Sequence, residues 1–324
     1  MSRPDPTPKL KNEPLGWVLV GVASMFWGTD LLFRPLVLKT GMGSVALVMV
    51  EHLALTAIFA PAIVLTWRTW TRLSRTEIAG LLFIAWGGSG LATVLLTKAY
   101  AAGEPFTATL LQKLQPAFAI TLAGPILKER PKRMFILCFA FAIVGAYLMS
   151  FGLTWITDPL SKRAVLSAEL ALGAAALWGA CTVIGRWSLQ RLEPFTVAGL
   201  RFALALPLLV GWNLFLDGSA KSKFSMPVGA WLPLLAIVLL PDALGMALYY
   251  FGLRRTTASL ATLAELAYPA TAVILAYPST HTFTAWKWLG LIVLIVSLYV
   301  IKQGDFITAP ADPETLDTTP QGLR

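Results

Sequence analysis

The sequence predicts an all-α membrane protein with ten transmembrane helices, arranged as two inverted five-helix repeats around a central cavity. The 324 residues are 56% hydrophobic and only 13% charged, whereas soluble domains carry about 25% charged residues. Long apolar segments follow one another along the chain, and short sequences recur 151 and 153 residues apart. With so little charge, the chain cannot cover a water-facing surface.

Ten segments are apolar and long enough to be transmembrane helices. A helix needs about 20 apolar residues to cross the hydrocarbon core of a bilayer. Glycines and polar residues interrupt the third, eighth and ninth segments, so the sequence defines their ends less sharply. The segments are residues 16–38, 44–66, 77–100, 106–127, 133–152, 168–189, 195–216, 229–252, 258–277 and 285–302.

Basic residues between the segments predict the orientation in the membrane. With the N-terminus inside, the inner segments hold Arg3, Lys9, Lys11, Arg68, Arg72, Arg75, Lys128, Arg130, Lys132, Arg133, Arg191, Arg254, Arg255 and Lys302. The outer loops hold only Lys39, Lys162, Arg163, Lys221 and Lys223. Because inner loops of membrane proteins are rich in Lys and Arg, both termini are predicted to lie in the cytoplasm, with the chain in the cytoplasmic (inner) membrane. The net charge of +9 is explained in the same way, without nucleic acid.

The chain repeats itself. "ATLLQKLQP" at 108–116 matches "ATLAELAYP" at 261–269, and "FWG" at 26–28 matches "LWG" at 177–179. Because each half has five helices, an odd number, the second half enters the membrane upside down relative to the first. The predicted parts are an N-terminal cytoplasmic tail, a first repeat, an extracytoplasmic linker, a second repeat and a disordered cytoplasmic tail, at 1–15, 16–152, 153–167, 168–302 and 303–324.

These motifs carry a resemblance to a known family. A "WG" lies early in each half, and "LQKLQPAFAITLAGPILKER" at 111–130 contains Pro116 and the pair Glu129-Arg130. In these residues the chain resembles the EamA-type branch of the drug/metabolite transporter superfamily over about residues 16–302. The resemblance implies ten helices around a central cavity and transport of small metabolites, often outward. One departure is "AYPSTHTFTAWKW" at 276–288, which has no Glu-Arg pair, so a capping or gating role of that pair belongs to the first half only.

Ionisable side chains inside the apolar segments are the candidates for a functional site. Each costs roughly 2.5–3.5 kcal/mol at the centre of a lipid-spanning helix, so it is expected to face a cavity or a partner. In the first segment Trp27, Asp30 and Arg34 are spaced i, i+3, i+7 and share one face. Pro35 predicts a kink directly after Arg34.

Two polar stripes of equal pitch lie at equivalent places in the two halves, and two facing stripes would line a wet cavity. They pair at an offset of 153, Thr109, Gln112 and Gln115 with Thr262, Glu265 and Tyr268. The predicted substrate-binding residues are Trp27, Asp30, Arg34, Lys98, Gln112, Lys113, Gln115, Trp178, Arg201, Tyr249, Glu265 and Tyr268.

This mixture of acids, bases and aromatic rings predicts a secondary transporter of a small polar or zwitterionic metabolite, such as an amino acid. Cations would hold a carboxylate, acids would hold an ammonium group, and the rings favour a substrate with an apolar part. Carboxylates inside membranes often relay protons. The proton-coupling candidates are therefore Asp30, Glu51, Asp242 and Glu265, and export is the predicted direction.

Plainer interpretations stay open for several of these residues. Asp30 and Arg34 can form a structural pair that neutralises itself. Arg34 and Lys98 lie toward helix ends and can extend to lipid headgroups. Trp27 and Trp178 can be packing residues that meet at the pseudo-two-fold axis.

Other chemistry has little support in the sequence. Cys138 and Cys181 lie in apolar runs, and His52 and His281 are too scattered for a metal cluster. There is no nucleotide P-loop, nucleophile elbow or zinc-protease motif. We therefore predict no catalytic residues, no cofactor and no metal, with a small molecule and the bilayer as partners and no signal for more than a monomer. The alternative is a flippase of the same fold for a lipid-linked or amphiphilic substrate.

Overall fold

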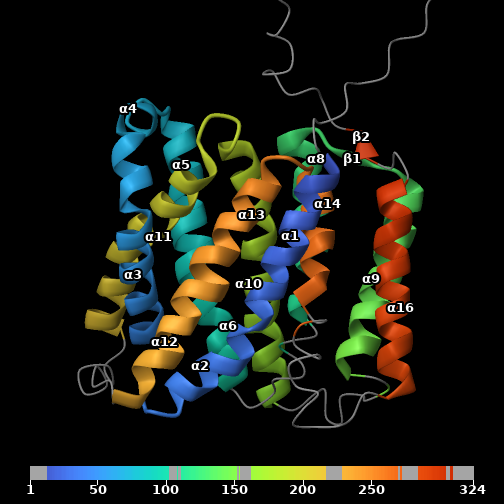
Figure 1. Ribbon diagram of the computed structural model, residues 1–324, viewed down its shortest axis with the longest axis horizontal. Coiled ribbons are helices and arrows are strands. Elements are labelled where there is room, and N and C mark those ends of the chain that lie inside the picture. The colour runs from blue at the N-terminus through green and yellow to red at the C-terminus, as the bar shows by residue number, and fades with distance from the viewer. Residues whose placement is uncertain are drawn as a thin grey trace, which may run out of the picture.

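The computed structural model describes residues 13–101, 108, 111–151, 153, 162–216, 228–268, 271, 284–303 and 307–308. In these ranges the chain is a bundle of helices whose axes lie roughly along one common line, with the chain running up some helices and down others (Figure 1). The first half contains α1 (Glu13–Gly28), α2 (Asp30–Leu38), α3 (Ser44–Leu65), α4 (Trp67–Trp70), α5 (Arg75–Phe83), η1 (Ile84–Leu91), α6 (Ala92–Ala101), α8 (Gln115–Leu127), β1 (Arg130–Pro131) and α9 (Arg133–Phe151).

The second half repeats this order in the opposite direction across the bundle. In Figure 1 α1 starts at the top and α10 starts at the bottom. The elements are α10 (Lys162–Ser188), α11 (Pro194–Gly211), η2 (Trp212–Leu216), η4 (Val228–Ala230), α12 (Trp231–Ile237), η5 (Val238–Leu244), α13 (Gly245–Leu253), α14 (Ala258–Ala264), η6 (Glu265–Ala267), α16 (Ala285–Gln303) and β2 (Ile307–Thr308). The two-residue strands β1 and β2 pair antiparallel, and the described residues are otherwise helices and turns.

The apolar helices agree with the ten predicted segments. By length and composition, six helical stretches can cross a membrane, namely Leu15–Leu38, Ser44–Leu65, Arg75–Ala99, Val165–Ser188, Pro194–Phe215 and Trp231–Leu253. Shorter apolar helices cover Gln115–Leu127, Arg133–Leu148, Ala258–Ala267 and Ala285–Ile301. Residues 106–107 and 109–110 of the fourth predicted segment, and residues 269–270 and 272–277 of the ninth, lie outside the described residues.

Two local predictions need correction. Helix α10 begins at Lys162, inside the predicted linker 153–167, because helical hydrogen bonding continues past the apolar residues that mark the membrane core. A break at Thr29 separates α1 from α2, and α2 continues without interruption through Pro35, where a kink was predicted. At the break the N–H and the hydroxyl of Thr29 both donate to the carbonyl of Phe26, at 3.0 and 2.7 Å.

The third helix of each half contains a π-helical stretch at an equivalent place. These stretches are η1, with the sequence IAWGGSGL, and η5, with VLLPDAL. A π-turn widens the helix locally, leaves backbone groups without their usual partners and often marks a functional site. The two stretches bring Ser89 and Asp242 to the middle of the bundle.

Close helix pairs join the two halves. Helix α1 packs on α13 so tightly that a Cβ on Gly252 would lie 2.5 Å from the carbonyl oxygen of Gly16. Helix α8 packs on α10, where a Cβ on Gly179 would lie 2.7 Å from the carbonyl oxygen of Gln115. The central site therefore lies between helices that belong to different halves.

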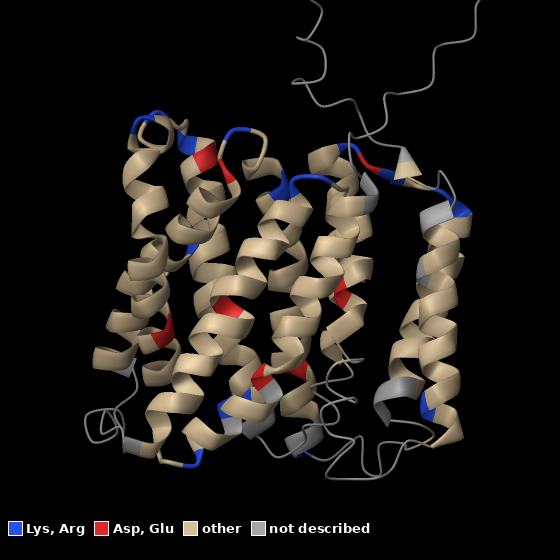
Figure 2. Ribbon diagram, in the orientation of Figure 1, with Lys and Arg blue, Asp and Glu red and all other residues tan. Residues whose placement is uncertain are grey.

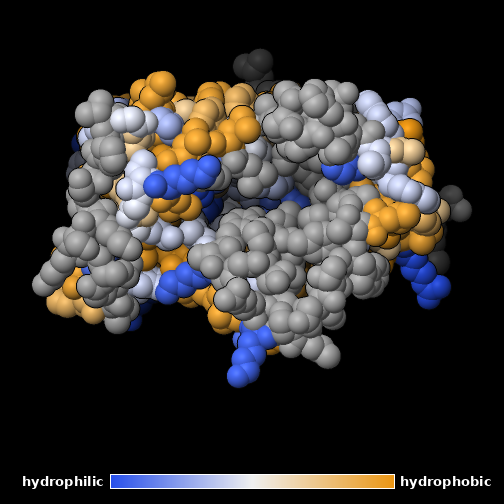
Figure 3. Space-filling view, turned by 90° about the horizontal axis from the view of Figure 1, so that it is seen from below, coloured by the Kyte–Doolittle hydropathy of each residue, from blue (hydrophilic) through white to orange (hydrophobic). Residues whose placement is uncertain are grey.

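The two ends of the bundle differ. We call the end where α1 begins, at the top of Figure 1, the N-face; α16 also ends there. Lysines and arginines gather at the helix ends, most of them at the N-face, and acidic residues lie both at the N-face and within the bundle (Figure 2). The opposite face is hollowed near its centre, with hydrophilic residues at depth (Figure 3). Large apolar side chains such as Phe141 and Ile292 are exposed on the outside of the bundle, as expected for contact with lipid.

Candidate functional site

The charged pair of the first segment is part of a larger ion cluster. In the structure, Arg34 Nε donates to Asp30 Oδ2 at 2.6 Å, and Arg34 Nη1 lies 3.1 Å from Glu51 Oε1 on α3. Glu51 is only 2% exposed. Asp242 of η5 lies within electrostatic range of all three. The cluster explains why the chain tolerates ions at this depth, because one guanidinium is shared between carboxylates of different helices.

Next to this cluster, Trp27 and Tyr249 bring α1 against α13. Their ring centroids are 5.1 Å apart, and the indole nitrogen of Trp27 lies 3.0 Å from the place where a Cβ on Gly245 would be. Several buried polar atoms in this region have no hydrogen-bond partner among the described residues: Trp27 Nε1, Asp30 Oδ1, Gln112 Oε1, Asp242 Oδ2 and Thr271 Oγ1. Buried polar groups are normally paired, so these atoms are available to a ligand or to water.

A second polar network joins the two predicted stripes. Gln115 Nε2 donates to Glu265 Oε2 at 2.5 Å. Thr182 Oγ1 of α10 lies 3.5 Å from Glu265 Oε1 and 2.8 Å from the hydroxyl of Tyr249. Gln115 of the first stripe therefore contacts Glu265 of the second, between α8 and η6.

Lys113 lies beside the same network. Its side chain is buried, with the ammonium 4.0 Å from the ring centroid of Tyr268 and within electrostatic range of Glu265. A cation over an aromatic face is attracted by the negative potential of the ring. The arrangement places one cation and one acid side by side at the centre of the bundle.

Three other predicted residues have different surroundings. Arg201 is buried, donates from Nε to Ser89 Oγ of η1, and lies 3.3 Å from the hydroxyl of Tyr250. Trp178 donates from Nε1 to the carbonyl of Gly88 at 2.9 Å, a backbone group of η1. Lys98 is exposed on α6, with its ammonium 5.3 Å from the ring centroid of Trp212. The structure therefore does not bring Lys98 to the central network.

Residues outside the predicted substrate-binding set complete the site. Thr182, Ser89 and Tyr250 supply hydroxyl partners to Glu265 and Arg201. Each is a polar side chain within an apolar helix. Hydroxyls are common in membrane helices, so they carry little information alone.

At the N-face, Glu129 caps a helix of the other half. The buried carboxylate accepts hydrogen bonds from the N–H groups of Ala258 and Ser259, at 2.8 and 2.9 Å, and from Ser259 Oγ at 2.6 Å. Lys128 just before it adopts the left-handed conformation, with φ of 59°, which turns the chain inward at the end of α8. Burial raises the pKa of Glu129 above the usual value, and the donated hydrogen bonds and the nearby Arg186 oppose this rise.

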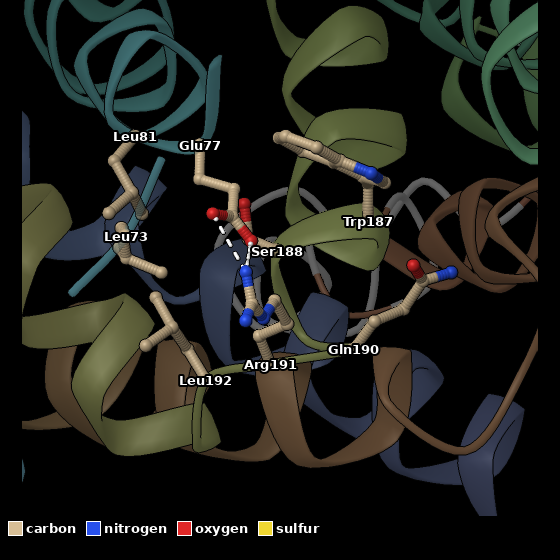
Figure 4. Close-up of a pocket in the computed structure, with 8 residues that line it drawn as sticks. All are labelled: Leu73, Glu77, Leu81, Trp187, Ser188, Gln190, Arg191 and Leu192. Carbon is tan, nitrogen blue, oxygen red and sulfur yellow. Dashed lines mark hydrogen bonds and ion pairs between the residues drawn. The ribbon is translucent and has the colours of Figure 1, made fainter. Parts of the chain in front are cut away.

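A separate small pocket lies near the N-face and is not suited to a metabolite. Leu73, Glu77, Leu81, Trp187, Ser188, Gln190, Arg191 and Leu192 line it (Figure 4). Its volume of about 30 Å³ holds one water molecule or little more. Arg191 Nη1 donates to both carboxylate oxygens of Glu77, at 2.8 and 3.0 Å, so the pocket surrounds an ion pair that joins the two halves. Elsewhere in the described residues, no group of three His, Cys, Asp or Glu side chains could hold a metal ion.

Comparison with known proteins assigns the fold to a family. Residues 14–151 and residues 166–303 each match the model of the EamA-like transporter family. The chain belongs to this family. It is therefore a multi-pass membrane protein of a family that transports small metabolites, and the two matches agree with the two predicted repeats.

Individual relatives support the same assignment. The riboflavin transporter ImpX of Fusobacterium nucleatum subsp. nucleatum is 29% identical over 272 residues, which cover 82% of this chain and 89% of that protein. A crystal structure of another protein has a TM-score of 0.71 at 17% identity, covering 89% of this chain and 96% of that one. That second likeness shows the fold alone.

Proposed function

We propose that this protein is a secondary transporter whose central site binds a flat, aromatic, uncharged metabolite with several hydrogen-bonding groups. Riboflavin is the first candidate. The observation that carries this proposal is which polar groups in the site already have protein partners and which do not. The buried guanidinium groups bind protein partners, whereas the indole N–H of Trp27 and several buried oxygens have no hydrogen-bond partner among the described residues.

The charges argue against a strongly anionic substrate. Arg34 is shared by Asp30 and Glu51, and Arg201 binds Ser89 and Tyr250. A phosphate or carboxylate would have to displace these partners and leave buried carboxylates without compensation, which is costly. An uncharged substrate avoids that cost.

The open groups suit a flavin. The ring of Trp27 is only partly buried against Tyr249, and an aromatic ring can stack on an extended aromatic molecule. The free indole N–H of Trp27 can donate to a ring carbonyl, and the free oxygens of Gln112, Asp242 and Thr271 can accept from imide and hydroxyl groups. The similarity to a riboflavin transporter points to the same substrate class.

A zwitterionic amino acid is the second candidate, and Lys113 favours it. The ammonium of Lys113 lies within electrostatic range of the carboxylate of Glu265, so the site offers one cation for a carboxylate and one acid for an ammonium group. An aromatic amino acid would also use the ring of Tyr268.

Transport into proteoliposomes tests both candidates. We would measure accumulation of labelled riboflavin, flavin mononucleotide and a panel of amino acids, from each side and with or without a pH gradient. Saturable riboflavin transport that excess unlabelled riboflavin abolishes, with little transport of the phosphorylated flavin, is the expected result. Transport of an amino acid without riboflavin would reject the first candidate. The same assay measures the direction, predicted as export, and the predicted coupling to protons.

A matched pair of variants locates the site. Trp27 and Trp178 occupy equivalent places in the two halves, but only Trp178 donates its indole N–H to the protein. Trp27→Phe is expected to weaken riboflavin binding about tenfold, because a hydrogen bond and part of the stacking area are lost. Trp178→Phe should lower stability and leave the affinity nearly unchanged. Equal affinity losses in both variants would place the substrate elsewhere.

A further inference from the structure

We propose that Glu129 is the latch of a gate at the N-face, which holds α8 of the first half against α14 of the second half and must release during each transport cycle. This inference rests on the transport function proposed above. It gives a role to Glu129 of the Glu129-Arg130 pair, which takes no part in the substrate site.

The latch joins the same two helices that meet at the substrate site. Along α8 the chain runs from Gln115 at the centre to Glu129 at the N-face, and along α14 and η6 it runs from Ser259 at the N-face to Glu265 at the centre. Gln115 binds Glu265, and Glu129 binds Ser259. The helices are thus tied at two levels, and access from the N-face between them requires that the outer tie break.

The contact between Glu129 and α14 is buried, and its hydrogen bonds can all break in one movement. Glu129 is 3% exposed, and its three hydrogen bonds all come from two adjacent residues, Ala258 and Ser259. Arg186 of α10 binds the carbonyl of Thr256 at 2.9 Å and lies within electrostatic range of Glu129, so a third helix contributes to the same closure.

The opposite face has no equivalent tie encoded in its sequence. Under the offset of 153, Glu129 corresponds to Thr282, and the stretch 276–288 contains no acidic residue. The opposite face is also the one with a central hollow (Figure 3). The structure is therefore the state closed at the N-face, where the bonds of Glu129 to Ala258 and Ser259 are made.

A cross-linking experiment tests whether the tie must open. The two free cysteines, Cys138 and Cys181, are first replaced by alanine, and the pair Glu129→Cys with Ser259→Cys is then linked by short bis-methanethiosulfonate reagents. Transport is expected to stop and to return on reduction. The control pair Glu193→Cys with Arg254→Cys replaces an ion pair within the second half, and its cross-link should leave transport intact. Full transport by protein linked between 129 and 259 would overturn the proposal.

A second measurement needs no substrate and so separates this inference from the proposed function. Gln115→Cys in the same background reports access to the centre, by its labelling rate with a membrane-impermeant maleimide added at the N-face. Adding Glu129→Ala is expected to raise this rate about tenfold, because three hydrogen bonds of the closed state are lost; Ser259→Ala, which removes one, should raise it less. An unchanged rate in the Glu129→Ala protein would refute the latch. If riboflavin is not transported at all, the proposed function fails while the labelling still decides the gate.

Discussion

Close packing of α1 on α13 makes a strong prediction for Gly252→Ala. The new Cβ would lie 2.5 Å from the carbonyl oxygen of Gly16, and 2.8 and 2.9 Å from Cγ2 and N of Val20. Ordinary contacts begin at about 3.4 Å, so the helices must separate by roughly 0.9 Å. The obstructing atoms are mostly backbone, which cannot rotate away as a side chain can.

The magnitude follows from two opposing terms. Overpacking of this kind costs about 1–3 kcal/mol, and the alanine recovers up to about 1 kcal/mol of helix propensity. We expect a net loss of about 1–2 kcal/mol, seen as a melting temperature lowered by roughly 2–4 °C in detergent. The separation also moves Trp27 away from Tyr249, so substrate affinity should fall in the same variant.

Gly211→Ala is the matched control. Gly211 is also helical, but no atom lies within 4 Å of its added Cβ. This variant should be neutral or stabilised by up to about 1 kcal/mol, with unchanged substrate affinity. The reasoning is refuted if Gly252→Ala melts at or above the temperature of Gly211→Ala and binds substrate equally well.

The remaining predictions concern charged groups. Arg34→Gln leaves Asp30 and the buried Glu51 without their cation, so it should destabilise by about 3–5 kcal/mol; Arg34→Gln with Glu51→Gln should recover most of the loss in the same thermal assay, and no recovery would mean that the pair is not coupled. Glu265→Gln should abolish dependence of transport on a pH gradient while substrate binding persists, and transport that stays fully gradient-dependent excludes this residue as the coupling site. Burial raises the pKa of Glu129, so its contribution to stability is fully present below the ordinary carboxyl pKa of about 4.3 and is lost as pH rises through the raised value; Glu129→Gln should flatten that part of the stability–pH curve, and an unchanged curve contradicts the assignment.

Much of the fold could be predicted because the membrane restricts the chain to a few solutions. Inside a bilayer every backbone group must be paired within a helix, so apolar length alone predicts the segments. The repeat of "ATLLQKLQP" as "ATLAELAYP" placed two polar stripes at equivalent positions, and in the structure one residue of each stripe, Gln115 and Glu265, is in contact. The predicted start of the sixth helix was wrong, because α10 begins at Lys162, before its apolar residues. Helical hydrogen bonding continues beyond the part of a helix that contacts lipid.

The sequence by itself determined the class of protein, the two repeats and the depth of the ionisable residues, because these depend on composition and spacing along single helices. Only the tertiary structure decided which of these residues remain available. In the sequence, Arg201 and Arg34 each look like a cation that is free to bind a substrate. In the structure, each binds a side chain of a distant helix. Trp27 and Trp178 occupy equivalent positions, yet one indole N–H is paired and the other is open. Such differences arise from contacts between helices, and the pattern along one helix does not specify what lies across from it.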